Sequence, residues 1–239
     1  MTAEEQCLPG ELDMTGQTLV VPCGPGHKGR TLYELSAAER TAEARAKTMT
    51  FTSSIQRFGG RFAVGTSKSV PGWFGGFDFG KKRAAWKVKG DEPGLFAAEP
   101  GCARGVISWL DGVHTVHELV KGKEVDSFQT ARSRGLAMSA DTIATIDVKG
   151  NITLRRDGAN SVVERDEPTE YGNLPLAFTE DGQHLLVGAS DGSVEIRDAA
   201  DGALRRTLVL HAGPFKDLRV AGGKLFSLGT DGALKVVSL

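Results

Sequence analysis

The sequence has only three cysteines, and their spacing is typical of neither a disulfide framework nor a zinc site. Cys7, Cys23 and Cys102 are odd in number, widely separated and free of any CxxC pair. We therefore expect three reduced thiols. No stretch approaches roughly 18 uninterrupted apolar residues, and the N-terminal MTAEEQCLPG lacks the basic and apolar regions of a signal peptide. We expect a soluble chain that is cytoplasmic or otherwise intracellular, unless an anchor belongs to a longer parent.

The chain also lacks an excess of either charge. It has 29 Lys and Arg against 30 Asp and Glu, for a formal net charge of -1. The chain therefore has no overall positive charge that would attract nucleic acid or an anionic membrane. HExxH and P-loop signatures are absent as well. We predict a protein that is not an enzyme, with no cofactor, no metal site and no nucleic-acid partner.

Glycine is plentiful, with 31 residues, and the clearest pattern repeats around it. The stretch from Leu176 to Ile196 aligns with the stretch from Asp217 to Val236. In both, short apolar or alternating runs flank an Asp-Gly pair, Asp191-Gly192 and then Asp231-Gly232. Such a pair predicts a hairpin, because Gly adopts a positive φ without steric cost. The pairs are 40 residues apart (231 minus 191), a period typical of propeller blades.

The period continues toward the N-terminus through Gly150, Gly112 and Gly72, and then less regularly through a Gly-rich segment near Gly26. We predict an all-β fold: one six-bladed β-propeller over residues 1–239, built of four-stranded antiparallel blades. The approximate blades are 9–48, 49–90, 91–130, 131–168, 169–210, and 211–239 together with 2–7.

Two segments leave alternatives open. The sixth unit ends after its third strand, so the N-terminal segment Thr2–Cys7 or a strand from a partner could complete the last blade and protect its edge. Ser36–Thr48 is rich in Ala, Glu and Arg, with Ser36 as a plausible N-cap, which is typical of a helix. Its position in the repeat instead requires the fourth strand of the first blade.

These patterns resemble the WD-repeat β-propeller family, most clearly over residues 174–239. The residues at the family's positions are His211-Ala212-Gly213 for the Gly-His element, Asp191 and Asp231 for the turn aspartate, and Arg197-Asp198 and Val237-Ser238 for Trp-Asp. No blade carries Trp-Asp, so the family's hydrogen-bonded tetrad of His, Ser or Thr, Trp and Asp is incomplete in every blade. The resemblance implies a non-enzymatic scaffold for protein partners, such as a subunit of a multiprotein assembly.

In the family's geometry, the turns between second and third strands share one face with the links between blades. The residues that this implies for partner binding are His27, Lys28, Trp73, Phe74, Asp111, Lys149, Asp191, His211 and Asp231. Trp73 and Phe74 lie among glycines and suggest an exposed interface hot spot. Alternatively, both rings fold back between the second and third blades. Trp86 and Trp109 are expected in the core between blades.

Two other functions stay open. A ligand- or metal-binding enzymatic propeller would act at the central channel, although the three-residue spacing of His114 and His117 sends them to opposite faces of a strand. The loop Gly24–Gly29, which includes Lys28, could bind an anion through its backbone. It is loosely similar to the Gly-rich loop of propeller exchange factors for a small GTPase of vesicle budding, which carry a membrane anchor that this chain lacks. A long hairpin loop is the simpler interpretation.

Overall fold

The computed structural model describes the strands up to residue 90, and then residues 93–101, 103–165 and 174–239. Two compact units can be distinguished. The first comprises residues 1–93, 101–104 and 116–126, and the second comprises residues 94–100, 105–115 and 127–239. Each unit is described by itself. Among the described residues, no helix is long and apolar enough to cross a bilayer.

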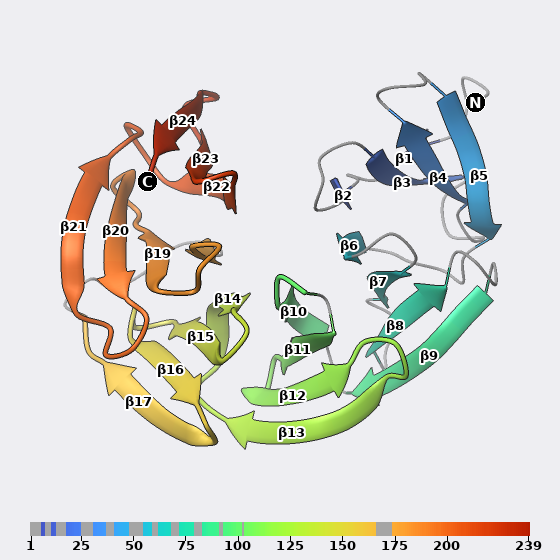
Figure 1. Cartoon of the computed structure of the whole chain (residues 1–239), viewed down its shortest axis with the longest axis horizontal. Coiled ribbons are helices and arrows are strands. Elements are labelled where there is room, and N and C mark those ends of the chain that lie inside the picture. The colour runs from blue at the N-terminus through green and yellow to red at the C-terminus, as the bar shows by residue number, and fades with distance from the viewer. Residues whose placement is uncertain are drawn as a thin grey trace. The chain divides into compact units, whose positions relative to one another are not determined.

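The described residues form six sheets (Figure 1). The first is five-stranded, with order β1-β3-β4-β5 and β2 paired to β3, and the second has order β6-β7-β8-β9. Their strands are β1 (Gln6–Cys7), β2 (Glu11–Leu12), β3 (Thr18–Gly24), β4 (Thr31–Ser36), β5 (Thr41–Lys47), β6 (Ile55–Phe58), β7 (Phe62–Ser67), β8 (Gly72–Asp78) and β9 (Arg83–Gly90).

The next three sheets each contain four consecutive strands, and the last contains three, β22-β23-β24. The strands of the third and fourth sheets are β10 (Pro93–Ala98), β11 (Arg104–Trp109), β12 (Val113–Glu118), β13 (Lys123–Gln129), β14 (Ser133–Met138), β15 (Thr142–Asp147), β16 (Ile152–Arg156) and β17 (Ala159–Val163). Those of the fifth and sixth sheets are β18 (Leu176–Phe178), β19 (His184–Gly188), β20 (Ser193–Asp198), β21 (Leu204–Val209), β22 (Phe215–Ala221), β23 (Lys224–Gly229) and β24 (Leu234–Ser238).

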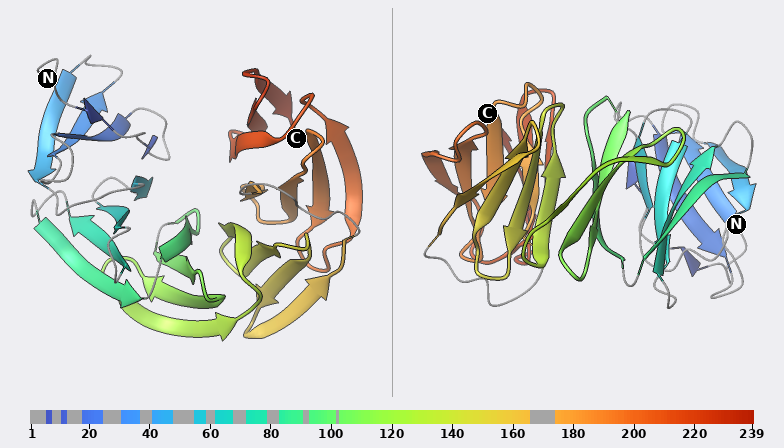
Figure 2. Two further views of the ribbon diagram at one scale, coloured as in Figure 1. Left: turned by 180° about the vertical axis from the view of Figure 1, so that it is seen from behind. Right: turned by 90° about the horizontal axis from the view of Figure 1, so that it is seen from below.

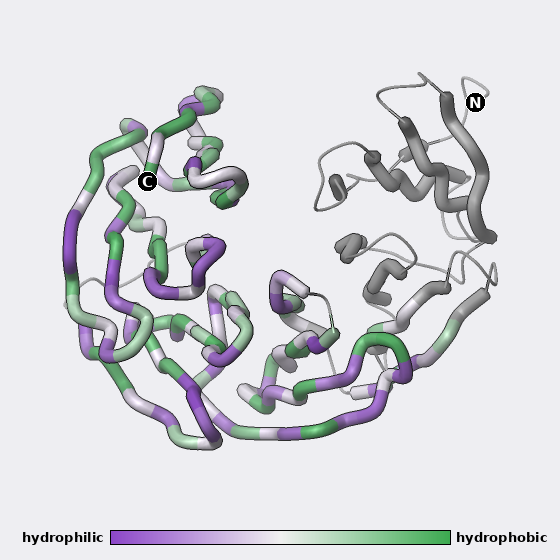
Figure 3. Tube along the Cα trace, in the orientation of Figure 1, coloured by the Kyte–Doolittle hydropathy of each residue, from purple (hydrophilic) through white to green (hydrophobic). Residues whose placement is uncertain are grey.

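Consecutive strands pair as antiparallel hairpins with the same register in the fifth and sixth sheets. Leu186 lies opposite Ile196, and 40 residues later Phe226 lies opposite Val236. Within the second unit, the strands of each sheet run side by side and twist (Figure 2). Hydrophilic and hydrophobic residues alternate along most of β20 (Figure 3), as the two faces of a strand allow.

Two apolar clusters join neighbouring sheets of the second unit. One lies between the fourth and fifth sheets and includes the fully buried Ile146, Ile152 and Leu185. The other lies between the fifth and sixth sheets and includes the fully buried Val194 and Leu225. Burial of side chains from adjacent sheets against one another is the main stabilising contribution to this architecture.

The predicted Gly turns are confirmed by backbone geometry. The turn before the third strand holds Gly112, Gly150, Gly192 and Gly232 at φ of 86°, 87°, 86° and 77°. At Gly192 a Cβ atom would also clash with the carbonyl oxygen of His211. Glycine is needed there for both conformation and close packing.

Several sequence predictions are corrected in the first unit. Thr41–Lys47 forms strand β5, which confirms the fourth strand that its position in the repeat requires and not the helix that its composition favours, because it pairs along its length with β4. Gly72, Trp73 and Phe74 lie inside strand β8 and not on a turn. Gln6–Cys7 pairs with Cys23 and Gly24 of β3, so these two residues do not complete the sixth sheet. Residues 2–5 lie outside the described part of the chain.

Candidate protein-interaction surface

Four hairpin turns and the links beside them form what we call the turn–link surface of the second unit. The turns are Asp111-Gly112, Lys149-Gly150, Asp191-Gly192 and Asp231-Gly232, and the links are 130–132 and 210–214. Asp111, Lys149, Asp191 and Asp231 are all exposed. The repeat therefore presents charged side chains at regular intervals along this surface.

Each turn aspartate closes its own turn by accepting a backbone hydrogen bond two residues on. Asp111 Oδ1 accepts from Val113 N at 3.0 Å, Asp191 from Ser193 N at 2.8 Å and Asp231 from Ala233 N at 2.9 Å. Hydrogen bonds from Ser193 lower the pKa of Asp191 below its ordinary value, since they favour the ionised form. The turns are thus fixed, and the lowered pKa keeps the Asp191 carboxylate charged at neutral pH.

In the fourth sheet, a different residue accepts the hydrogen bonds that close the turn. Lys149 occupies the aspartate position, and Asp147 instead accepts hydrogen bonds from Lys149 N at 2.8 Å and Asn151 N at 3.0 Å. The Lys149 side chain is exposed. A positive charge therefore interrupts the row of turn aspartates.

The links are bonded to the turns. Thr130 N donates to Gly112 O at 3.1 Å, and Leu210 N and His211 N both donate to Gly192 O at 3.0 Å. At the fourth sheet, the Arg165 guanidinium donates to Gly150 O at 3.4 Å. These bonds hold each turn against its link, so the surface is preorganised rather than made of free loops.

His211 holds the last link to the sixth sheet. Its side chain is fully buried, with Nδ1 at 3.1 Å from both carboxylate oxygens of Asp231 and Nε2 at 3.0 Å from Ser227 Oγ. Its ring meets Phe215 edge-on, with centroids 5.1 Å apart. The backbone N–H of Ala233 is the main cause that lowers the pKa of Asp231, and His211 adds to it. Three of the four groups of the family's tetrad therefore meet here.

A buried ion cluster lies between the fourth and fifth sheets. Glu195 binds Arg165 Nη2 at 2.8 Å and Arg197 Nε at 2.6 Å, and Arg197 also donates to Gly202 O at 2.8 Å. Burial alone would raise the pKa of Glu195, but the two arginines outweigh it and lower the pKa. Arg197 stands at the family's Trp position, so a polar contact replaces the expected indole. Sequence reasoning missed this cluster, because Arg165 lies 30 residues before its partner.

His114 is a second buried histidine that the sequence did not single out as structural. It has no solvent exposure, and its ring stacks on Phe128 with centroids 4.6 Å apart. Nε2 lies 2.7 Å from Thr130 Oγ1, while Nδ1 is buried without a hydrogen-bond partner. Burial lowers the pKa of His114 to about 4, and the nearby Asp111 offsets this only in part. The imidazole is neutral at pH 7.

In the first unit, Trp86 packs against the turn that follows β12. Its indole N–H donates to Leu119 O, and its ring stacks on His117 at 6.4 Å between centroids. Burial lowers the pKa of His117 as well. The expected burial of Trp86 and Trp109 is confirmed, with 9 % and 6 % exposure. His114 and His117 thus contact different residues.

The predicted binding residues divide into three groups. Asp111, Lys149, Asp191 and Asp231 lie on the turn–link surface as expected. Phe74 and His211 are buried, at 0 % and 4 % exposure, which corrects the expectation that they are available to a partner. His27 and Lys28 lie outside the described residues, as does the side chain of Trp73.

Catalytic or metal-binding clusters are not found among the residues that the structure describes. No group of three or more His, Cys, Asp or Glu there could hold a metal ion. The segment GASDG, Gly188–Gly192, has the spacing of a hydrolase nucleophile motif. Ser190 nevertheless lies in a β-hairpin turn, whereas that motif requires a strand-to-helix turn.

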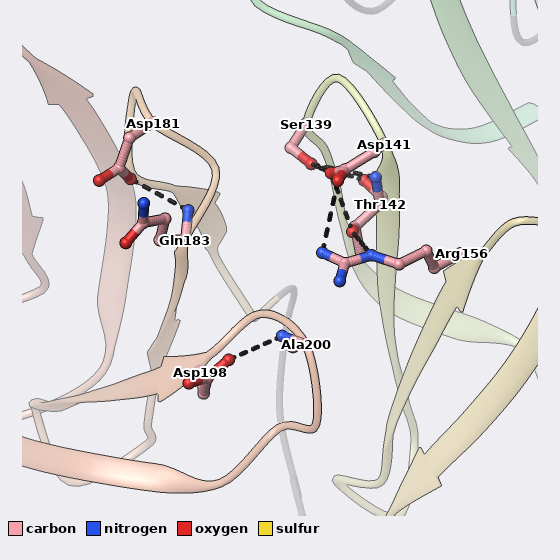
Figure 4. Close-up of polar contacts among 8 residues, drawn as sticks. All are labelled: Ser139, Asp141, Thr142, Arg156, Asp181, Gln183, Asp198 and Ala200. Atoms are coloured by element: carbon pink, nitrogen blue, oxygen red, sulfur yellow. Dashed lines mark hydrogen bonds and ion pairs between the residues drawn. The ribbon is translucent and has the colours of Figure 1, made fainter.

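The opposite turns of the same sheets carry self-contained polar contacts (Figure 4). Asp141 accepts from Ser139 Oγ at 3.1 Å and pairs with Arg156 at 3.6 Å. Asp181 and Asp198 likewise accept backbone hydrogen bonds within their own turns. These turns provide controls of similar chemistry for the turn–link surface.

Comparisons with known proteins agree with this architecture. Residues 134–218 match the family model described as the anaphase-promoting complex subunit 4 WD40 domain. No curated protein sequence matches the chain. Among solved structures, Hsv2 of Kluyveromyces marxianus has a TM-score of 0.73 at 13 % identity, with 96 % of this chain and 71 % of that chain covered.

Two further structures are similar. Hsv2 of Kluyveromyces lactis has a TM-score of 0.70 at 14 % identity, covering 98 % of this chain and 73 % of that chain. The β-propeller domain of Cps50 (Swd1) from Myceliophteria thermophila has a TM-score of 0.62 at 16 % identity, covering 74 % and 62 %. The fold is an all-β propeller of antiparallel four-stranded blades. The WD40 domain match over residues 134–218 and the His211–Asp231–Ser227 contacts confirm the resemblance of this chain to WD-repeat β-propellers.

Proposed function

We propose that this protein is a non-enzymatic scaffold that binds other proteins through its turn–link surface. The observation that carries the proposal is the row of exposed charged side chains on turns whose backbones are hydrogen-bonded in place. A preorganised surface loses little conformational entropy on binding, so more of its contact energy appears as affinity. Binding residues are often carried by such turns on a rigid scaffold.

We further propose a single six-bladed propeller that acts inside the cell as a subunit of a multiprotein assembly. The six described sheets and the 40-residue repeat support the blade count. The matched family is named for a subunit of a complex, which supports the assembly role. Trp73, His27 and Lys28 complete the proposed partner-binding set.

Replacing turn aspartates by asparagine tests the proposal, because asparagine can keep the turn hydrogen bond while losing the charge. The test variant is Asp111→Asn with Asp191→Asn, and the control is Asp141→Asn with Asp181→Asn on the opposite turns. Tagged proteins are expressed in the native host, and captured partners are quantified by mass spectrometry. We expect the test variant to lose partners that the wild type and the control retain. Identical partner profiles for all three would refute this surface.

The alternative functions lack a supporting observation of this kind. Nucleotide exchange on a small GTPase depends on the Lys28 loop, which lies outside the described residues. Loss of exchange activity on replacing Lys28 would be needed to support it. Enzymatic action at a central channel would require a ligand set, and tight binding of a metal or small molecule by the purified protein would favour it.

A further inference from the structure

Exposed apolar residues gather on the link between the fifth and sixth sheets. This link leads from the end of β21 to the start of β22 (Figure 1). Val209, Ala212 and Pro214 are exposed along it, and Val209, at 81 %, is the most exposed large hydrophobic residue in the described part of the chain. A lone exposed valine needs no explanation, whereas three apolar residues on one link are a candidate contact surface. We call residues 209–214 the apolar link.

The position of Val209 holds a polar residue in the third and fourth sheets. The hydrogen bonds between links and turn glycines place Gln129 there in the third sheet, and the strand registers place Glu164 there in the fourth. Both residues are exposed, and Gln129 Nε2 donates to Asp111 O at 3.2 Å. Strands favour valine, but two sister strands form with a polar residue at this position. Strand formation therefore does not require the exposed valine.

An exposed aspartate lies on each side of the apolar link. Backbone hydrogen bonds join the link to Gly192 on one side and to Thr230 on the other. Its neighbours are therefore Asp191, in the turn with Gly192, and Asp231, which follows Thr230. Hydrogen bonds from within each turn lower the pKa of both carboxyls, so both are ionised at neutral pH. An approaching partner meets an apolar strip between two negative charges.

The link between the third and fourth sheets has a different character. Arg132 is exposed on that link, and Lys149 stands where the sixth sheet has Asp231. The apolar link itself carries no basic residue apart from the buried His211, and Lys216 follows it only beyond the start of β22. A basic segment is therefore attracted to the apolar link and not to the equivalent link two sheets earlier.

We propose that the apolar link binds a segment of a partner protein in which a large apolar residue lies between two basic residues. The apolar side chain packs on Val209 and Pro214, and the basic side chains pair with Asp191 and Asp231. Apolar contact provides the affinity, and the charges provide orientation and selectivity. The fifth sheet already has four strands and the link continues into β22, so its exposed side is not a vacant strand position. The inference rests on the proposed scaffold function and names the chemistry of its partner.

A random dodecapeptide library displayed on phage is the probe. The wild-type protein is immobilised, and an excess of the soluble Val209→Lys variant removes phage that bind elsewhere on the molecule. We expect enriched peptides that share a large apolar residue between two Lys or Arg residues. No enrichment, or an enriched motif without basic residues, would overturn the proposal.

An enriched peptide, labelled with fluorescein, measures the contribution of Val209 by fluorescence anisotropy. Val209→Lys should weaken binding about tenfold or more, because it removes the apolar contact and repels the basic residues. Leu204→Lys is the control, since Leu204 is 52 % exposed at the other end of the same strand, and it should bind like the wild type. Val209→Thr keeps a β-branched side chain for the strand and should also weaken binding, which keeps the test valid if the lysine perturbs folding.

A double-mutant cycle tests the charge pairing at Asp191, because the Asp231 carboxylate also binds His211. Asp191→Asn can keep the turn hydrogen bond and should weaken peptide binding about two- to fivefold. Replacing one of the two basic peptide residues by Gln should weaken binding similarly, and the two changes together should weaken it no further than either alone. Asp111→Asn, at the same turn position in the third sheet, should leave binding unchanged. Additive losses for both basic residues would refute the pairing.

Three other results would each overturn the proposal. A concentration-dependent dimer in sedimentation velocity that Val209→Lys dissociates would show that a second copy covers the apolar link. A much larger loss of unfolding free energy in urea for Val209→Lys than for Leu204→Lys would show that another part of the same polypeptide covers it. If enriched peptides bind Val209→Lys as tightly as the wild type, yet Asp111→Asn with Asp191→Asn still loses captured partners, the scaffold function stands and the apolar link alone is refuted.

Discussion

Mild acid should destabilise the second unit through His114. The folded imidazole has its pKa lowered to about 4 from 6.5, because the ring is buried between Phe128 and the link at Thr130 with Nδ1 facing no acceptor. The unfolded state therefore binds a proton that the folded state excludes. Stability is fully present above about pH 6.5 and falls as pH drops toward 4.

The size of the effect follows from the two pKa values. A shift of about 2.5 pKa units corresponds to roughly 3 kcal/mol below pH 4, and integration to about pH 5 gives roughly 2 kcal/mol. The assay is urea denaturation between about pH 8 and pH 5, followed by tryptophan fluorescence and far-ultraviolet circular dichroism. Coincident transitions in the two signals establish that unfolding is two-state.

The matched variant is His114→Val, since valine occupies this position in the fifth sheet as Val194. Thr130 keeps a partner in the variant, because its hydroxyl donates to Ala131 O. We expect the variant to lose about 2 kcal/mol less than the wild type between pH 8 and pH 5. The pH dependence of the unfolding free energy that remains in the variant comes from the other titrating groups, including His117. Parallel pH profiles for the two proteins would refute the assignment to His114.

Three substitutions test the contacts that build the turn–link surface. His211→Ala should cost about 1–3 kcal/mol of unfolding free energy in urea melts, because it leaves the buried Ser227 hydroxyl unsatisfied. Gly192→Ala should cost more than about 2 kcal/mol in the same melts, since the new Cβ meets a carbonyl oxygen at a strained positive φ. Glu195→Ala should cost about 2–4 kcal/mol by thermal denaturation, because the Arg165 guanidinium, 3 % exposed, loses its carboxylate.

Each of these three substitutions has a matched control variant. Gly158 also has a positive φ, of 78°, but nothing lies near its Cβ position, so Gly158→Ala isolates the conformational cost at about 1 kcal/mol. Equal losses at the two glycines would contradict the packing argument. The half-buried His184 on β19 is the control for His211, and His184→Ala should cost less. For the ion cluster, Arg205→Ala removes an exposed pair with Asp198 and should change stability much less than Glu195→Ala does, because solvent screens the exposed charges.

The local rules of the sequence predicted the second unit well. An Asp-Gly pair specifies its turn through positive φ and a side-chain hydrogen bond, both of which are short-range, so the hairpins at Gly192 and Gly232 could be placed before the structure. The partial match of the His211 region to the family pattern could also be recognised from the sequence, because its residues stand at fixed positions within one repeat. These features depend on residues that are close in sequence or one period apart.

Predictions failed where distant contacts decide the structure. The composition of Thr41–Lys47 favours a helix, whereas its position in the repeat predicts the strand that it forms beside β4. The glycines beside Trp73 and Phe74 predict a turn, but these residues lie in strand β8, where the Trp86 ring packs on Gly76. The burial of His114 depends on Phe128 in another strand, and the Glu195 cluster depends on Arg165 in another sheet. No periodicity in the sequence encodes those contacts.

Hydrogen–deuterium exchange on a complex with a captured partner tests the central claim most directly. The claim is that the turn–link surface contacts the partner. We expect slower exchange at segments 188–193 and 209–214, and unchanged exchange at the opposite turns, 139–142 and 179–183. Slower exchange confined to the opposite turns would contradict the account.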